Sequence, residues 1–114
     1  MMRLLAAFLF AVFATSASAE DALSLYRSGK YEAAITAAIA QNNATGFALA
    51  ARAALGAALT QKQKPCLSCL QRAEGFARKA IAADAHLPDG HTYLAVSLGY
   101  EARIIGTVRA RLAN

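Results

Sequence analysis

The abundance of alanine is the feature that most limits what this chain can fold into. Beyond residue 19, alanine supplies 24 of the 95 remaining residues, β-branched residues are sparse, and the only prolines are Pro65 and Pro88. Alanine has the highest helix propensity, and proline interrupts a helix more strongly than any other residue. The composition therefore predicts an all-α fold whose helices are interrupted at a few defined points.

Five segments carry the apolar spacing of amphipathic helices, with hydrophobic residues every three or four positions. We expect these helices over residues 21–27, 31–41, 44–60, 66–83 and 89–114. Gly29 allows the left-handed turn that ends a helix, and Asn43 and Asp89 are good N-caps for the helices that follow them. Because the connections are short, successive helices should form antiparallel hairpins.

The N-terminus has the three parts of a secretory signal peptide. The opening Met-Met-Arg is positively charged, residues 4–13 form an unbroken apolar run, and residues 17–19 form an A-x-A cleavage site. A membrane anchor is the alternative, but the run is about half of the roughly 20 residues that a spanning helix needs. We therefore predict a signal peptide over residues 1–19, cleaved near Ala19, and an exported domain over residues 20–114 that is periplasmic or secreted.

The exported part is mildly basic. Its 11 lysines and arginines against 7 acids give a net charge of about +4. The basic residues are scattered over several segments, which is typical of solvated helix faces and argues against a nucleic-acid partner. Association with a membrane surface through Arg103, Arg109 and Arg111 is a weaker alternative, because Glu101 and the short basic segment limit the local field.

Cys66 and Cys69 are the two cysteines of the chain and its sharpest chemical feature. An exported protein meets an oxidising compartment, so a structural disulfide at the start of a helix is the first interpretation. Free thiols and a redox-active pair stay open as alternatives, since a helix N-terminus stabilises a thiolate. Redox motifs of this spacing normally follow a strand, however, and the sequence shows no strand pattern.

No other pattern indicates a metal, a cofactor or a catalytic centre. The sequence positions of Cys66, Cys69, His86 and His91 follow a spacing close to that of a zinc finger. A helix from Cys69 to Ala83 would rise about 21 Å, however, whereas all four ligands must lie within about 2.3 Å of the metal. Nucleophile elbows, phosphate loops and dinucleotide-binding glycine motifs are missing from the sequence. We expect a protein without enzymatic activity and without a cofactor.

Two pairs of apolar residues recur with the same spacing. Ala34 precedes Leu55 by 21 residues and Ala73 precedes Leu94 by 21, so the repeat unit is 39 residues long. This exceeds the 34 residues of a tetratricopeptide repeat by 5, which is the length of the polar segment 61–65.

Residues around these landmarks resemble the tetratricopeptide repeat family. The turn between paired helices in that family is matched by residues 29–34 (Gly-Lys-Tyr-Glu-Ala-Ala). Its Leu-Gly pair is matched by Leu55-Gly56, with Leu94-Ala95 at the next such position. Its small second-helix residues are matched by Ala73, Ala77 and Ala80. The match covers most of residues 26–98. The chain departs from the family pattern at several positions. Arg52 and His91 stand where the family usually has a large aromatic residue, Leu59 and Leu98 where it has a tyrosine, and Ala85 where it has a proline. An unrelated helical bundle is the alternative.

The resemblance implies a short solenoid of stacked hairpins that binds proteins in a groove lined by the first helix of each pair. In this chain, the groove would be lined by Ala50, Ala53, Ala57, Thr60, Asp89, Thr92 and Val96. These residues lack the aromatic and arginine anchors that usually carry binding energy, so the surface can simply hold another helix of the same protein.

The last predicted helix leaves apolar side chains without cover. We regard these as candidate partner-binding residues: Ile104, Ile105, Val108 and Leu112. Either a partner protein covers them, or further helical repeats of the same protein do and the domain is incomplete at its C-terminus. The sequence thus predicts an exported, non-catalytic protein-interaction module, and the alternative is a thiol redox protein that uses the Cys66/Cys69 pair.

Overall fold

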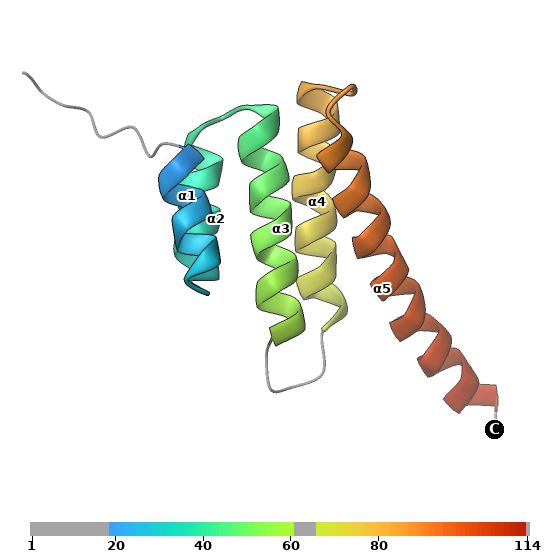
Figure 1. Ribbon diagram of the computed structural model, residues 1–114. Helices are drawn as coiled ribbons and strands as arrows, with labels where there is room; N and C mark the ends of the chain where they lie inside the picture. Colours follow the sequence, from blue (N-terminus) through green and yellow to red (C-terminus); the bar gives the residue numbers. More distant parts are fainter. Residues whose placement is uncertain (1–18, 61–65, 114) are drawn as a thin grey trace, which may run out of the picture.

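The computed structural model describes residues 19–60 and 66–113, and every regular element in these ranges is a helix (Figure 1). The helices are α1 (Ala19–Arg27), α2 (Tyr31–Ala40), α3 (Ala44–Thr60), α4 (Leu67–Ala83) and α5 (Pro88–Ala113). The all-α prediction is therefore confirmed, with small shifts at the helix ends. The predicted signal peptide, apart from Ala19, lies outside the described residues. Among the helices described, none has both the length and the apolarity to cross a bilayer.

Side chains at the turns explain where the central helices begin. Gly29 has a φ of 76°, the left-handed conformation that lets the chain reverse between α1 and α2. Asn43 Oδ1 accepts a 2.7 Å hydrogen bond from the Gly46 N–H, which confirms Asn43 as the N-cap of α3. Cys66 Sγ accepts from the Cys69 N–H in the same way at the start of α4.

The predicted N-cap of the last helix is wrong. α5 begins at Pro88, so Asp89 lies inside its first turn. Proline suits the first helical position, because its φ is already helical and its missing N–H would have no partner there. The carboxylate of Asp89 still lies at the positive end of the helix dipole, where negative charge is favoured.

Alanine forms most of the core between the helices. Each helix packs against its neighbours in the chain, successive helices run in opposite directions, and α3 also contacts α1 and α5 (Figure 1). Ile35 and Leu70 are the largest apolar side chains that are fully buried, amid Ala34, Ala38, Ala50, Ala53, Ala54, Ala58, Ala73, Ala77 and Ala80. Small side chains allow helix axes to approach closely, as the hairpin interpretation requires.

Two glycines of α3 lie where it approaches α2 most closely. A Cβ atom on Gly46 would collide with the backbone carbonyl oxygen of Ala38. A Cβ atom on Gly56 would lie 2.6 Å from Cε1 of the Tyr31 ring. The Leu-Gly pair noted in the sequence therefore has a packing role, since the absent side chain of Gly56 makes room for an aromatic ring.

Candidate functional site

α5 extends well past the helix against which it packs. α4 has 17 residues and α5 has 26, which makes α5 longer by about 14 Å at about 1.5 Å per residue. Gly90 packs against Ala80 and Ile81, so the start of α5 lies beside the end of α4 and the excess length falls at the C-terminal end (Figure 1). Over residues 102–113, Ile104 is partly buried and the other residues are exposed.

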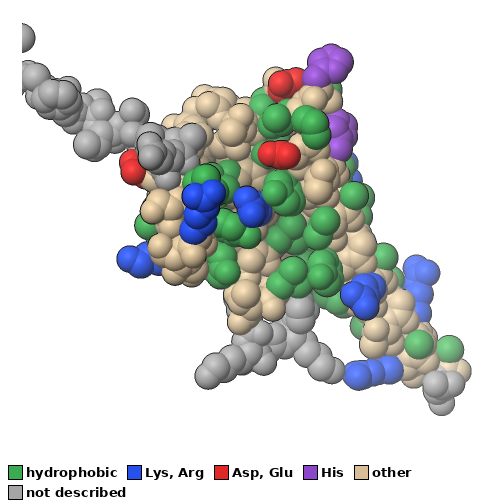
Figure 2. Space-filling view, viewed as in Figure 1, with side chains coloured by type: hydrophobic (Ala, Val, Ile, Leu, Met, Phe, Trp, Pro, Cys, Tyr) green, Lys and Arg blue, Asp and Glu red, His purple; other side chains and the backbone are tan. Residues whose placement is uncertain are grey.

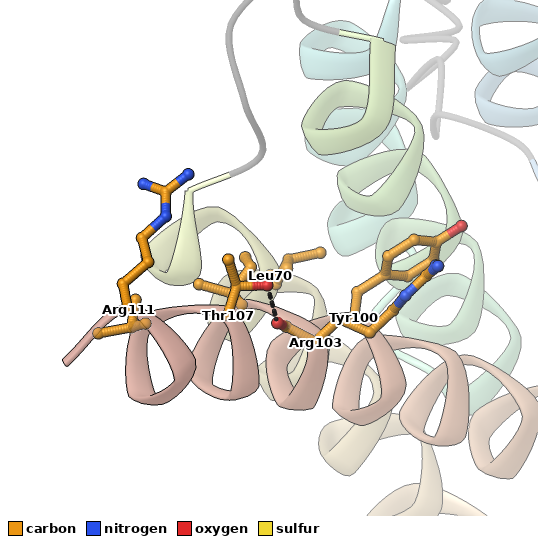
Figure 3. A pocket seen from close by; sticks show the side chains of 7 residues that line it. Leu70, Tyr100, Arg103, Thr107 and Arg111 are labelled. Carbon is orange, nitrogen blue, oxygen red and sulfur yellow. Dashed lines mark hydrogen bonds between the residues drawn. The ribbon is translucent and has the colours of Figure 1, made fainter. Parts of the chain in front are cut away.

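A hollow of about 380 Å³ opens between the start of α4 and the second half of α5 (Figure 3). Its lining consists of Leu70, Tyr100, Arg103, Ile104, Thr107, Val108 and Arg111. The α5 members recur three or four positions apart, so they share one face of the helix, with Tyr100 and Arg111 at opposite ends of the row. The Thr107 hydroxyl donates to the Arg103 carbonyl oxygen at 2.9 Å and is satisfied within the helix. Most of the surface that lines the hollow is apolar.

The structure brings two of the four predicted partner-binding residues to this hollow. Ile104 and Val108 line it. Ile105 and Leu112 lie on the adjoining strip of α5 and are 43% and 81% exposed. Figure 2 shows hydrophobic and basic side chains interspersed along this end of the molecule. The part that these four residues take in binding stays a prediction.

The charged side chains that line the hollow are both arginines in the part of the chain that the structure describes. Arg103 and Arg111 line it, Arg109 lies on the same exposed part of α5, and the sequence contains no acid after Glu101. The Arg103 guanidinium lies 5.9 Å from the centroid of the Tyr100 ring. Among the described residues, the ion pairs are Arg72–Glu32 and Arg78–Glu74, so these three arginines have no carboxylate partner in that part of the chain.

A buried carboxyl group lies where α5 leaves α4. Glu101 is 7% exposed, and its Oε2 has no hydrogen-bond partner within the described ranges. Burial, followed by the neighbouring Glu74 carboxylate, raises the pKa of Glu101. Arg78 Nε donates to Glu74 at 2.7 Å, and this hydrogen bond lowers the pKa of Glu74. Among the described residues, no third His, Cys, Asp or Glu joins this pair in a cluster.

Cys66 and Cys69 form a disulfide with their Cα atoms 5.2 Å apart. The first interpretation of the cysteines is thus supported, and neither is a free thiol. Cys66 is exposed, whereas Cys69 packs against the core beside Leu70. The histidines of the zinc-finger-like spacing lie beyond the other end of α4, where His91 Nε2 donates to a backbone carbonyl at 2.7 Å.

A second hollow of about 230 Å³ lies across α1, α3 and α5 and includes Asp89, one of the residues predicted to line the groove. Its lining is Leu23, Thr45, Leu49, Arg52, Asp89 and Tyr93. Ala50 and Ala53, predicted to line the groove, are fully buried in the core, because α3 turns Leu49 and Arg52 outward instead. The Arg52 guanidinium lies 4.5 Å from the centroid of the Tyr26 ring. This hollow therefore carries an arginine and a tyrosine, which the groove residues chosen from the sequence lacked, although Arg52 was already visible as a departure from the family pattern.

No family model, no curated protein and no solved structure matches this chain. The two hollows are therefore interpreted from their geometry and chemistry.

Proposed function

We propose that the chain is an exported, non-catalytic protein-interaction module of tetratricopeptide type that binds through the α4–α5 hollow. The observation that carries this proposal is the uncovered apolar surface of α5, where Ile105, Val108 and Leu112 project beside a hollow. Large apolar side chains that gather at one exposed place mark a surface that another molecule covers. The covering molecule is a partner protein or a further helical repeat of the same protein.

The contacts between alternate helices support the tetratricopeptide type. α3 contacts both α1 and α5, as the first helices of successive hairpins do in a stack. α2 and α4 are linked on the other layer by a bidentate ion pair, in which Arg72 donates to the two Glu32 carboxylate oxygens at 2.8 and 2.9 Å. The Cys66–Cys69 disulfide is compatible with export, because such bonds persist in oxidising compartments.

Site-specific photocrosslinking tests the interaction proposal. A photoreactive residue in place of Val108 should give a discrete adduct with a partner, whereas one in place of Ile39, which is 38% exposed on α2, should not. Ile105→Glu with Val108→Glu should lower partner capture at least about tenfold, because burying carboxylates in an apolar contact is unfavourable. Ile39→Glu is the matched control. Unchanged capture by the double variant contradicts the proposal.

Export has a separate test. N-terminal sequencing of the secreted chain should begin near Glu20. Retention of an uncut chain in the cytoplasm contradicts the export part of the proposal and leaves the interaction part standing.

A thiol redox function is the second candidate, and the position of Cys66 favours it. The exposed Sγ atom accepts the Cys69 N–H at 3.1 Å at the start of α4. After reduction, this N–H and the helix dipole would stabilise a thiolate at that atom. Alkylation of the reduced native chain should then be fast at neutral pH. Slow alkylation, together with unchanged function when both cysteines become serine, rejects this candidate.

A further inference from the structure

We infer that the α4–α5 hollow binds an acidic amphipathic helix of another protein. This inference rests on the proposed function and adds the chemistry of the partner. The inference combines three observations: the uncompensated arginines, the concave apolar lining, and the length of the hollow along α5.

The charge of the surface selects a negative partner. Arg103 and Arg111 line the hollow, and no acidic residue does among residues 19–60 and 66–113. The nearest acid in the sequence, Glu101, is buried and faces Glu74 instead of the hollow's arginines. Two or three arginines without internal carboxylate partners repel a basic ligand and attract an acidic one.

The shape of the surface selects a helix. Ile104 and Val108 share a concave lining with Leu70, which comes from a different helix. An apolar corner between two helices fits the apolar stripe of a third helix, as in other helix-in-groove complexes. From Tyr100 to Arg111 the lining spans about 16 Å, or about three turns of a partner helix.

The arginine spacing fixes where the acids of the partner should lie. Arg103 and Arg111 are about 12 Å apart along the axis of α5. A helix lying alongside should therefore carry carboxylates about seven or eight residues apart, bordering an apolar stripe with the usual three- and four-residue spacing. Arginine binds carboxylates in a fork geometry, which reinforces this preference.

Two other occupants fit less well. A second copy of the chain, with α5 helices antiparallel and centred on Gly106, would place Arg103 of one copy beside Arg109 of the other, so like charges would meet. An anionic bilayer could take up the projecting Ile105 and Leu112, but its flat surface does not fill the hollow that Ile104 and Val108 line with Leu70. A helix from a different protein satisfies both the charge and the shape.

Fluorescence anisotropy with designed peptides tests the inference. The probe is a capped, labelled helical peptide of about 16 residues with a leucine stripe and two glutamates about eight residues apart. Matched peptides carry glutamine or lysine in place of the glutamates. We expect affinities in the order glutamate, glutamine, lysine, with at least about a tenfold difference between the first and the last at low ionic strength.

A charge-reversed chain completes the test. Arg103→Glu with Arg111→Glu should invert the order, so that the lysine peptide binds best, and circular dichroism should confirm that the variant is folded. Both side chains are exposed, so the fold should tolerate these changes. Added salt should reduce the difference between the peptides.

Each contrary outcome is distinguishable. Equal binding of all three peptides overturns the acidic preference and leaves the proposed protein-binding function standing. Binding of none overturns the inference of an acidic helical partner, and photocrosslinking at Val108 then decides the proposed function separately. Flotation with phosphatidylglycerol vesicles in the absence of peptide binding assigns the surface to a membrane and overturns the inference. A dimer by light scattering that Val108→Glu dissociates assigns it to a second copy, with the same consequence.

Discussion

One substitution, glycine to alanine, should have opposite effects at two helical positions of this protein. Gly46 is buried in α3, where an added Cβ would collide with the Ala38 carbonyl oxygen of α2. Gly75 is exposed in α4, and an added Cβ there would have no atom within 4 Å. Alanine has the higher helix propensity at both positions, so a loss of stability at Gly46 alone reports the close approach of α2 and α3.

The magnitudes follow from packing and propensity. Gly75→Ala should raise the free energy of unfolding by about 0.5–1 kcal/mol, because alanine loses less conformational entropy in a helix. Gly46→Ala gains at most the same propensity, because Gly46 lies in the first turn of α3, and it must displace backbone. Overpacking of this kind costs about 1–3 kcal/mol. Because the atom that the new Cβ meets belongs to the backbone, the cost should fall in the upper part of that range. The net result at Gly46 should therefore be a loss of about 1–2 kcal/mol, or a decrease in Tm of about 4–15 °C for a domain of this size.

Urea unfolding followed by far-UV circular dichroism measures both changes. The slope of the free energy with denaturant should stay constant, so that a shift in midpoint reports stability. If Gly46→Ala is neutral or stabilising, then α2 and α3 do not approach as closely as described, and the interpretation of small residues as the cause of hairpin packing is wrong.

Three further predictions concern stability. Glu101→Gln should raise the free energy of unfolding at neutral pH by about 1 kcal/mol, because it removes a buried charge whose Oε2 atom has no hydrogen-bond partner among the described residues. Because the folded-state pKa of Glu101 is raised, the stability of the wild type should fall as pH rises above the unfolded-state pKa, and the variant should lack this slope. Glu32→Gln should lower the free energy of unfolding by less than about 1 kcal/mol in urea unfolding, because its ion pair with Arg72 is exposed. Because the pKa of Glu32 is lowered in the folded state, this stabilisation should be lost as pH falls through the folded-state pKa, and a stability difference that does not change with pH would contradict the prediction. The double variant Cys66→Ser with Cys69→Ala should be more stable by about 1 kcal/mol than the variant with alanine at both positions, because a serine hydroxyl can still cap α4. Equal Tm values of the two variants would refute the capping role.

The positions of the helices could be predicted from the sequence because their causes are local. Alanine content, apolar period and the turn residues act within a few positions of each other, and Asn43 caps α3 as its residue type predicts. The α4–α5 hollow depends instead on register between two helices. Contact of Gly90 with Ala80 and Ile81 sets that register, and no local pattern gives it.

The misplaced groove residues have the same origin. Ala50 and Arg52 are two positions apart, or about 200° around a helix, and only the packing of α3 among its neighbours decides which of them faces inward. Alanine on several sides of α3 removes the polar contrast that normally marks the buried face. The sequence therefore predicted a helix there correctly, but Ala50 and Ala53, which it assigned to an exposed groove, face the core.

The hollow itself follows from the sizes of the side chains along α5. At the start of α5, Gly90 packs against alanine, and Ser97 is fully buried with its hydroxyl bonded to a backbone carbonyl of its own helix at 2.7 Å. The next buried position is the larger Glu101, followed by Ile104 near Leu70, and α5 leans away from α4 in this direction (Figure 1). Helices separate where bulky side chains replace small ones. The surface open to a partner therefore begins where the small residues of α5 stop facing α4.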